Sequence, residues 1–438
     1  MRPMRQTHFL MFTTLVAVAG FGGCDETTSP SHQTSSSGSS SSTSSGVAGT
    51  GGHASGGNGG GATGGGGGGI GGNGGFGGAG GAGGSGATGG LGNVDIVDVP
   101  DSTCETLSGT LVELYPDNSN APPIASLFQV NGKRLAGGRF IPGFVTFGLD
   151  GSSPSVAPIG LDPDFDLVTS EGATIGLVTS DAVTIRFQRY SSMESPVGGP
   201  LLLGNSKGAG LAIAGGANGG SLMVWANATS LTAQYVDAAG AAGSAYPFAE
   251  GIAVNSIDTS LIRSGNEFAL AWSVIDKGLA RARFVRLSPT GVLGNIVELT
   301  GDAFKHYVVK MVKTPTGYAL LLHSGGFSFD TIVVILDAQG QVVGSARRFL
   351  GTKFAMDLAV QGTHLGLVAK RADGVTEFRA LDANADPVGN WKCIDGMSLD
   401  SYDQAAIDAD GTGWAIVYRT PGGGEKFVRT NLNGTGAP

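Results

Sequence analysis

The residues whose types could support chemistry are oxygen donors at alternate positions in three short stretches. These stretches contain Asp162, Asp164 and Asp166 (LDPDFDL), Asp382, Asn384 and Asp386 (DANADP), and Asp408 and Asp410 (DADGTG). Such spacing matches the start of a Ca²⁺-binding loop, but Leu167 and Pro387 stand where that loop requires glycine. All three stretches fall at expected turns, where Asp and Asn bond their own backbone. The sequence therefore favours structural turns, and calcium ligation is the alternative.

Other catalytic residue types show no pattern of convergence. Beyond residue 92 the histidines are His306, His323 and His364, and they occupy different positions in the repeat described below. A catalytic or metal site needs side chains that meet at one point. The string GNSKG (residues 204–208) matches G-x-S-x-G, but the sequence after it does not indicate the helix that a nucleophile elbow needs. We therefore predict no catalytic residue and no cofactor.

A repeat of about 46 to 50 residues organises the chain from about residue 124 onward. Its marker is a short apolar strand that appears at residues 175–180, 221–226, 268–273, 318–323, 365–370 and 414–419 (IGLVTS, SLMVWA, FALAWS, YALLLH, LGLVAK and WAIVYR). A degenerate seventh copy is expected around residues 133–140 (KRLAGGRF). Alternating strands flank each marker, and no helical period is evident.

Turns at matching positions follow the second flanking strand: VDAAGAAGS, LSPTGVLGN, LDAQGQVVGS and LDANADPVGN. Glycine at the fourth turn position, present as Gly240, Gly291 and Gly340, is expected to take a positive φ. Four strands in each repeat, with turns marked by glycine, are typical of a β-propeller blade. The sequence thus predicts an all-β protein with a seven-bladed propeller, or six blades if the first copy is not a blade.

The last copy lacks a fourth strand, because the chain ends at Pro438 soon after KFVRTNLNGTG. We expect residues 108–116 (SGTLVELYP) to complete it, since propellers commonly close with a strand from the other terminus. Cys104 precedes this strand and Cys393 lies on the last strand of the copy before, so a disulfide between them fits the closure. Two separate buried thiols are the alternative.

Large side chains recur at one position of the marker strand, as Trp225, Trp272, Leu322 and Tyr418. Aromatic rings there could line a ligand-binding face. Packing between neighbouring blades explains the same pattern with fewer assumptions, and it is the interpretation that we favour.

The amino terminus has the three parts of an export signal. Arg2 and Arg5 form a basic region, residues 9–19 form an apolar region, and small residues precede Cys24. The apolar stretch is shorter than the roughly 18 to 20 residues of a membrane-spanning helix. A serine-rich run and a glycine-rich tract follow up to residue 92 and are expected to be disordered, because they contain too little apolar surface to form a core.

Residues Phe21, Gly22, Gly23 and Cys24 resemble the lipobox of bacterial lipoproteins, Leu-(Ala/Ser)-(Gly/Ala)-Cys, with Phe21 in place of the usual leucine. The resemblance implies cleavage before Cys24, a lipid thioether on its sulfur and acylation of its amine by a chain such as palmitate. Ordinary cleavage that leaves Cys24 free or disulfide-bonded is the alternative. The expected domains are a signal peptide (1–23), a tether (24–92) and a propeller-like repeat domain (93–438).

Composition limits the class of partner. The formal net charge of −9, without a cluster of Lys and Arg, argues against nucleic acid. We expect a binding or scaffold module for an unknown protein or glycan, attached by lipid on Cys24 at the bacterial envelope. Asp25 resembles an inner-membrane retention signal, yet the outer membrane or cell surface is favoured. The alternative function is a propeller-type hydrolase or lyase that acts on envelope or extracellular polymers.

Overall fold

A computed structural model describes residues 94–438 with internal gaps. The gaps are residues 116–125, 131–132, 138–142, 159–164, 172–173, 181–182, 193–194, 206–210, 228–229, 250–257, 277–278, 301–304, 326–329, 352, 372, 398–404 and 421–423. The chain divides into two units, Met1–Gly81 and Ala82–Pro438, and all described residues belong to the second. The expected signal peptide, Cys24 and the tether lie outside the described residues and remain predictions.

All regular elements of the described residues are β-strands, and they form seven sheets. The first sheet contains β4 (Ser126–Val130), β5 (Lys133–Gly137), β6 (Gly143–Gly148) and β7 (Ser155–Pro158). The second contains β8 (Phe165–Glu171), β9 (Thr174–Ser180), β10 (Thr184–Ser192) and β11 (Ser195–Asn205). The third contains β12 (Ala212–Gly215), β13 (Ser221–Ala226), β14 (Leu231–Val236) and β15 (Tyr246–Phe248).

The remaining four sheets follow the same antiparallel order. The fourth contains β16 (Thr259–Ser264), β17 (Glu267–Asp276), β18 (Leu279–Ser288) and β19 (Gly291–Glu298). The fifth contains β20 (Lys305–Lys313), β21 (Gly317–Gly325), β22 (Thr331–Asp337) and β23 (Ala346–Phe349). The sixth contains β24 (Lys353–Gln361), β25 (His364–Arg371), β26 (Val375–Leu381) and β27 (Lys392–Met397), and the seventh contains β28 (Ala405–Ala409), β29 (Gly413–Arg419) and β30 (Glu425–Asn431).

The marker strands are the second strands of the second to seventh sheets, and β5 is the corresponding strand of the first. They are buried on both faces: every residue of β13 is buried, and so are the first six of β21 and of β29. A strand buried on both faces loses the apolar and polar alternation of a half-exposed strand. This is why the markers are mostly apolar and show no regular alternation.

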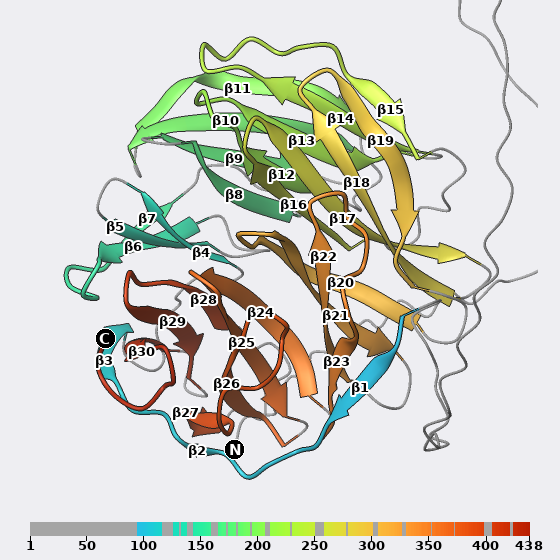
Figure 1. The fold of residues 1–438 in the computed structure, drawn as a ribbon. Helices are drawn as coiled ribbons and strands as arrows, with labels where there is room; N and C mark the ends of the chain where they lie inside the picture. The colour runs from blue at the N-terminus through green and yellow to red at the C-terminus, as the bar shows by residue number, and fades with distance from the viewer. Residues whose placement is uncertain are drawn as a thin grey trace, which may run out of the picture. The chain divides into compact units, whose positions relative to one another are not determined.

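The sheets follow one another in a closed ring. The first strand of each sheet contacts the first strand of the next, and β28 of the seventh sheet contacts β4 of the first. Figure 1 shows the successive sheets, coloured from green to red. Radially arranged four-stranded antiparallel sheets define a β-propeller. The predicted all-β propeller class is therefore confirmed.

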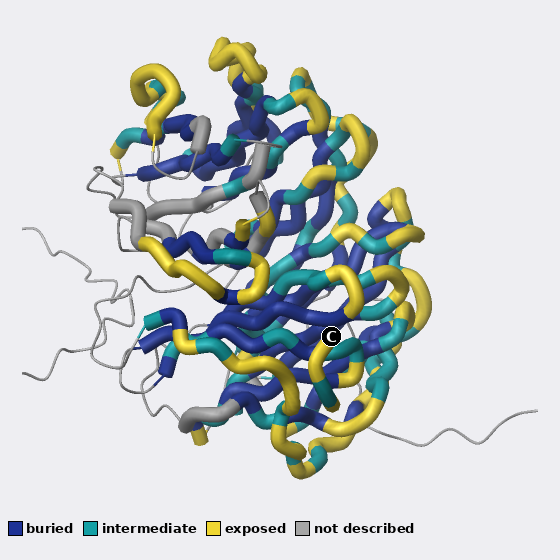
Figure 2. The backbone as a smooth tube through the Cα atoms, turned by 90° about the vertical axis from the view of Figure 1, so that its left-hand side faces the viewer, coloured by how far each residue is buried: buried dark blue, intermediate teal, exposed yellow. Residues whose placement is uncertain are grey.

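The core is divided among the junctions between neighbouring sheets. Trp272 packs in a cluster with residues of the third sheet, Leu322 with residues of the fourth, and Tyr418 with residues of the sixth. Trp225 packs with Val178 and Phe187 of the second sheet. Figure 2 shows buried strands and exposed connecting turns. The interpretation of the recurring large side chains as packing between blades is confirmed.

An N-terminal belt, residues 94–115, runs along three sheets. Its last strand, β3 (Thr110–Tyr115), pairs antiparallel with β30 and completes the seventh sheet, as predicted. Before that, β1 (Ile96–Val99) adds to β23 of the fifth sheet and β2 (Glu105–Thr106) adds to β27 of the sixth, both in parallel. Figure 1 shows the three blue strands in succession. The sequence did not indicate the two parallel additions.

The turn prediction is correct in part. Gly240 and Gly340 have φ of 86° and 84°, and the amide of each donates to the Asp carbonyl three residues earlier. Gly291 does not have a positive φ, which contradicts the prediction, because it already pairs with Ser288 as the first residue of β19. In the fourth turn, Ala385 takes the left-handed conformation with φ of 62°.

Candidate functional site

Charged side chains meet where the fifth, sixth, seventh and first sheets follow one another. Lys310 lies on β20 and Asp357 on β24, and in each strand the register shifts just before the charged residue. Such bulges re-aim side chains and often lie next to functional sites. Lys310 Nζ lies 3.1 Å from Asp357 Oδ1. This ion pair joins the first strand of the fifth sheet to the first strand of the sixth.

Asp357 also links the sixth sheet to the seventh. Its carboxylate is buried, and Oδ1 accepts a hydrogen bond of 2.9 Å from the amide of Leu358. Oδ2 accepts one of 2.9 Å from the amide of Ile407 on β28. A buried carboxylate is tolerated only when it is paired and hydrogen-bonded. Asp357 satisfies this condition with one cation and two backbone donors.

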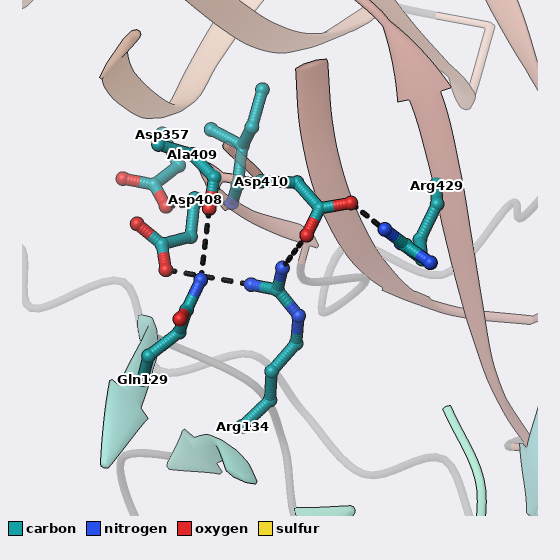
Figure 3. Close-up of polar contacts among 8 residues, drawn as sticks. Gln129, Arg134, Asp357, Asp408, Ala409, Asp410 and Arg429 are labelled. Carbon is teal, nitrogen blue, oxygen red and sulfur yellow. Dashed lines mark hydrogen bonds and ion pairs between the residues drawn. The ribbon is translucent and has the colours of Figure 1, made fainter. Parts of the chain in front are cut away.

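Arg134, on β5 of the first sheet, reaches the acids at the end of β28. Its side chain is fully buried, and the guanidinium lies 3.5 Å from Asp408 Oδ2 and forms an ion pair with Asp410. Asp410 is shared, because its other oxygen accepts a 2.5 Å hydrogen bond from Arg429 Nε. Figure 3 shows Asp410 between the two arginines. Burial lowers the pKa of Arg134 from its usual value, and the attraction of Asp410 and Asp408 opposes this shift.

Asp357 and Asp408 place two carboxylates from neighbouring sheets side by side (Figure 3). Burial raises the pKa of Asp408 to about 6; Asp357 adds to this shift, and Arg134 and Lys310 oppose it. Asp408 therefore gains a proton in mildly acidic solution. A carboxyl group with a raised pKa beside a second carboxylate is the arrangement that acid–base catalysts use. Here, however, the cluster contains three carboxylates and three cationic side chains, so its charges balance.

Sequence reasoning identified only part of this charged cluster. Asp408 and Asp410 were recognised as turn acids, but Arg134, Lys310 and Asp357 were not. Arg134 lies 274 residues from Asp408, so no local spacing could join them. One signal was available: an arginine within KRLAGGRF stands in the strand position that is otherwise apolar in the repeat.

The structure gives the stretch 382–386 a structural role. Asp382 Oδ1 accepts hydrogen bonds of 2.8 Å from the amides of Asn384 and Asp386. The Asp386 carboxylate accepts hydrogen bonds of 2.6 and 3.1 Å from Arg347 of the fifth sheet. Pairing with Arg347 also lowers the pKa of Asp386. The hydrogen bonds to Asp382 form an Asx-type turn, and the pairing of Asp386 with Arg347 connects this turn to the neighbouring sheet.

The other acid stretch is barely described. Asp162 and Asp164 fall in a gap, and only the backbone of Asp166, in β8, is described. The calcium alternative for these three residues stays untested. Ser206 of the GNSKG string also lies outside the described residues.

His306 and His323 lie on the paired strands β20 and β21, one register position apart, whereas His364 lies in the next sheet. His323 on β21 stacks on Tyr307 with ring centroids 5.0 Å apart, and burial lowers its pKa to about 4. His306 is buried on β20, and His364 begins β25 of the next sheet. Among the described residues, no histidine belongs to a group of three or more side chains that could hold a metal ion.

The two remaining cysteines are close together. The Cα atoms of Cys104 and Cys393 lie 5.3 Å apart, within the range for a disulfide, and the structure joins the two side chains in one. The bond fastens the N-terminal belt to β27. Glu377, on β26, lies beside it: its carboxylate and both sulfurs are within 4.8 Å of one another.

No protein-family model matches this chain, and no curated protein matches it. Among solved structures, a streptogramin B lyase matches with 13% identity and a TM-score of 0.47, over 74% of this chain and 98% of the lyase. Hsv2 of Kluyveromyces lactis matches with 11% identity and a TM-score of 0.45, over 68% and 90%. YCF48 bound to a D1 peptide matches with 12% identity and a TM-score of 0.44, over 76% and 98%. The assignment to the propeller class depends on the strand topology.

No helix long and apolar enough to cross a bilayer occurs in the described part of the chain.

Proposed function

We propose that this protein is a β-propeller binding module, held at a bacterial envelope by lipid on Cys24. The observation that supports binding over catalysis is the internal balance of the charged cluster. Asp357, Asp408 and Asp410 each contact a cation, and Asp357 also accepts backbone hydrogen bonds. Carboxylates held in this way stabilise the junction between sheets.

The amino-terminal sequence supports the anchor. Phe21 to Cys24 resembles a lipobox, and a long serine- and glycine-rich tract separates it from the first described strand. Two or three acyl chains hold a protein stably on a membrane, whereas a single chain holds it only marginally. A tether of this composition would allow the propeller to sample partners at some distance from the lipid surface.

The anchor is tested by detergent-phase partitioning and by incorporation of labelled palmitate in the producing bacterium. The native chain should enter the detergent phase and carry label, whereas Cys24→Ala should do neither. Cys393→Ala is the matched control. It should still be labelled, because Cys393 follows no signal sequence and is not the expected site of the lipid. If native and Cys24→Ala chains are both soluble and unlabelled, the anchor proposal fails.

Binding is tested with the full-length protein against immobilised neutral and acidic polysaccharides and purified envelope proteins. Saturable retention without new reducing ends or unsaturated products supports a binding module. The second candidate, a hydrolase or lyase, is favoured by one observation: the pair Asp357 and Asp408, in which Asp408 has a raised pKa. Release of products that Asp408→Asn abolishes would favour that enzyme and contradict the binding proposal.

A further inference from the structure

Three metal-ligating side chains meet at the outer edge of the sixth sheet. Cys393 on β27 pairs directly with Glu377 on β26, so their side chains share one face of the sheet. Cys104 reaches the same place from the N-terminal belt. The two sulfurs and a carboxylate oxygen all lie within 4.8 Å of one another. Glu377 is buried and both cysteines are partly buried, so the site is at the surface but not open to bulk water.

The backbone holds these three residues together independently of the sulfur–sulfur bond. The amide of Glu105 donates to the carbonyl of Trp391 over 2.8 Å, and the amide of Leu107 donates to the carbonyl of Cys393 over 2.9 Å. The side chain of Glu105 also pairs with Lys392. Reduction of the disulfide would therefore leave Cys104 beside Cys393.

The charges around the site suit a dication with anionic ligands. Two thiolates and one carboxylate carry three negative charges, of which a dication neutralises two. Arg371 Nη1 lies 3.7 Å from Glu377 Oε1, so this one cation balances the single negative charge that remains.

Removing a carboxylate from water is costly, and Arg371 is one partner that offsets this cost for Glu377. A thiophilic cation would use all three side chains at once. Zinc with three protein ligands and one water is a common arrangement, with Zn–S distances of about 2.3 Å and Zn–O distances of about 2.0 to 2.2 Å.

We propose that the reduced protein binds one Zn²⁺ through Cys104, Cys393 and Glu377, at the place where the oxidised protein has a disulfide. A thiol or phosphine reductant supplies two electrons and is itself oxidised, to a disulfide or a phosphine oxide, and two protons from the thiol reductant or from water complete the conversion of the disulfide to two thiols. Each thiol then releases one proton to solvent as its sulfur binds the ion, so two protons leave for each Zn²⁺ bound. The disulfide and the zinc site exclude each other, because they use the same sulfurs. This site is independent of the proposed binding function.

The test uses the full-length chain with Cys24→Ser, so that the third cysteine does not contribute. The protein is reduced with a phosphine, freed of reductant without oxygen, and titrated with Co²⁺ and then Zn²⁺. We expect one equivalent bound, a thiolate-to-cobalt charge-transfer band, tetrahedral d–d bands, and two protons released for each Zn²⁺. The oxidised protein should show none of these signals.

Variants separate this site from adventitious binding. Cys104→Ser should abolish the charge-transfer band, and Glu377→Gln should weaken Zn²⁺ binding at least about tenfold. Glu298 is a more exposed carboxylate that pairs with Arg281 at 3.1 Å, and it serves as the control. Glu298→Gln should bind Zn²⁺ as tightly as the parent does. Near-ultraviolet circular dichroism of the oxidised variants checks their folding.

X-ray absorption of the Zn²⁺-loaded parent measures the ligands directly, so the proposal does not depend on the variants alone. We expect two sulfur neighbours at about 2.3 Å together with oxygen neighbours. The proposal is overturned if the reduced parent takes up no more metal than the oxidised parent, or if sulfur is absent from the metal's neighbours. It is also overturned if Glu377→Gln binds as tightly as the parent, or if reduction unfolds the chain and Zn²⁺ does not restore it.

Discussion

Tyr115 on β3 pairs directly with Glu425 on β30, at the seam where the N-terminal strand closes the propeller. The Tyr115 hydroxyl and both carboxylate oxygens of Glu425 are buried, and among the described residues none of them has a hydrogen-bond partner. Arg419 pairs with Glu425 from the other side, on β29. Burial raises the pKa of Glu425 to about 8, and Arg419 opposes this shift. The closing seam therefore contains a carboxyl group that is protonated at neutral pH.

Stability should fall as pH rises through the range in which Glu425 ionises. A raised pKa in the folded state means that the folded protein holds the proton more tightly. The stabilisation is fully present below the ordinary pKa of 4.5 and is lost as pH rises to about 8. Glu425→Gln should remove this dependence and stabilise the protein at pH 9 by on the order of a few kcal/mol. Urea unfolding between pH 5 and 9 measures it.

Glu113→Gln, an exposed change on β3, the strand that pairs with β30, is the control and should keep the parent's pH dependence. If Glu425→Gln and the parent lose stability equally between pH 5 and 9, the buried carboxyl is not the cause.

Removing Arg134 should weaken the junction between the seventh and first sheets. Arg134→Met leaves Asp408 without its arginine, and the loss of one partner from a buried ion pair costs about 3 to 5 kcal/mol. The loss should be smaller at pH 5 than at pH 8, because Asp408, with a pKa of about 6, is then protonated. Adding Asp408→Asn should recover part of the loss. Arg281→Met breaks a more exposed pair and should cost no more than about 1 kcal/mol.

Gly340 should be far less replaceable than Gly344 in the same turn. Both have a positive φ, of 84° and 71°, so alanine is strained at either position. A Cβ on Gly340 would also collide with the Phe284 ring of the fourth sheet, whereas nothing lies within 4 Å of one on Gly344. Thermal unfolding should show a loss of about 1 kcal/mol for Gly344→Ala and a clearly larger one for Gly340→Ala. Equal losses would show that this contact between sheets is not tight.

The disulfide should hold the N-terminal belt in place. Cys104 and Cys393 are 289 residues apart, and removing a native disulfide typically costs 2 to 5 kcal/mol. The double change Cys104→Ser and Cys393→Ser should therefore lower the free energy of unfolding. Hydrogen exchange of residues 94–107 should speed up more than that of β13, because the belt pairs with strands of the fifth, sixth and seventh sheets, whereas β13 lies in the third. Uniform acceleration of both segments would contradict a local role.

The repeat in the sequence was sufficient to predict much of the fold. A strand buried on both faces is apolar at most consecutive positions, so the second strands could be recognised from local sequence alone. Counting the strands in each copy also showed that the last copy lacks its fourth strand, and β3 completes that sheet. The additions of β1 and β2 could not be predicted, because strands of four and two residues carry little pattern.

The candidate site could be predicted only in fragments. The sequence by itself determined the strand period, the turns of Asp382 and Asp408, and the cysteines beside the closing strand. Only the tertiary structure brought Arg134 to Asp408, Lys310 to Asp357, and Glu377 to the two cysteines. The physical reason is that local pattern reports which faces of a strand are buried, whereas contacts between sheets depend on how the ring closes. In this protein the closure joins residues that lie more than two hundred positions apart.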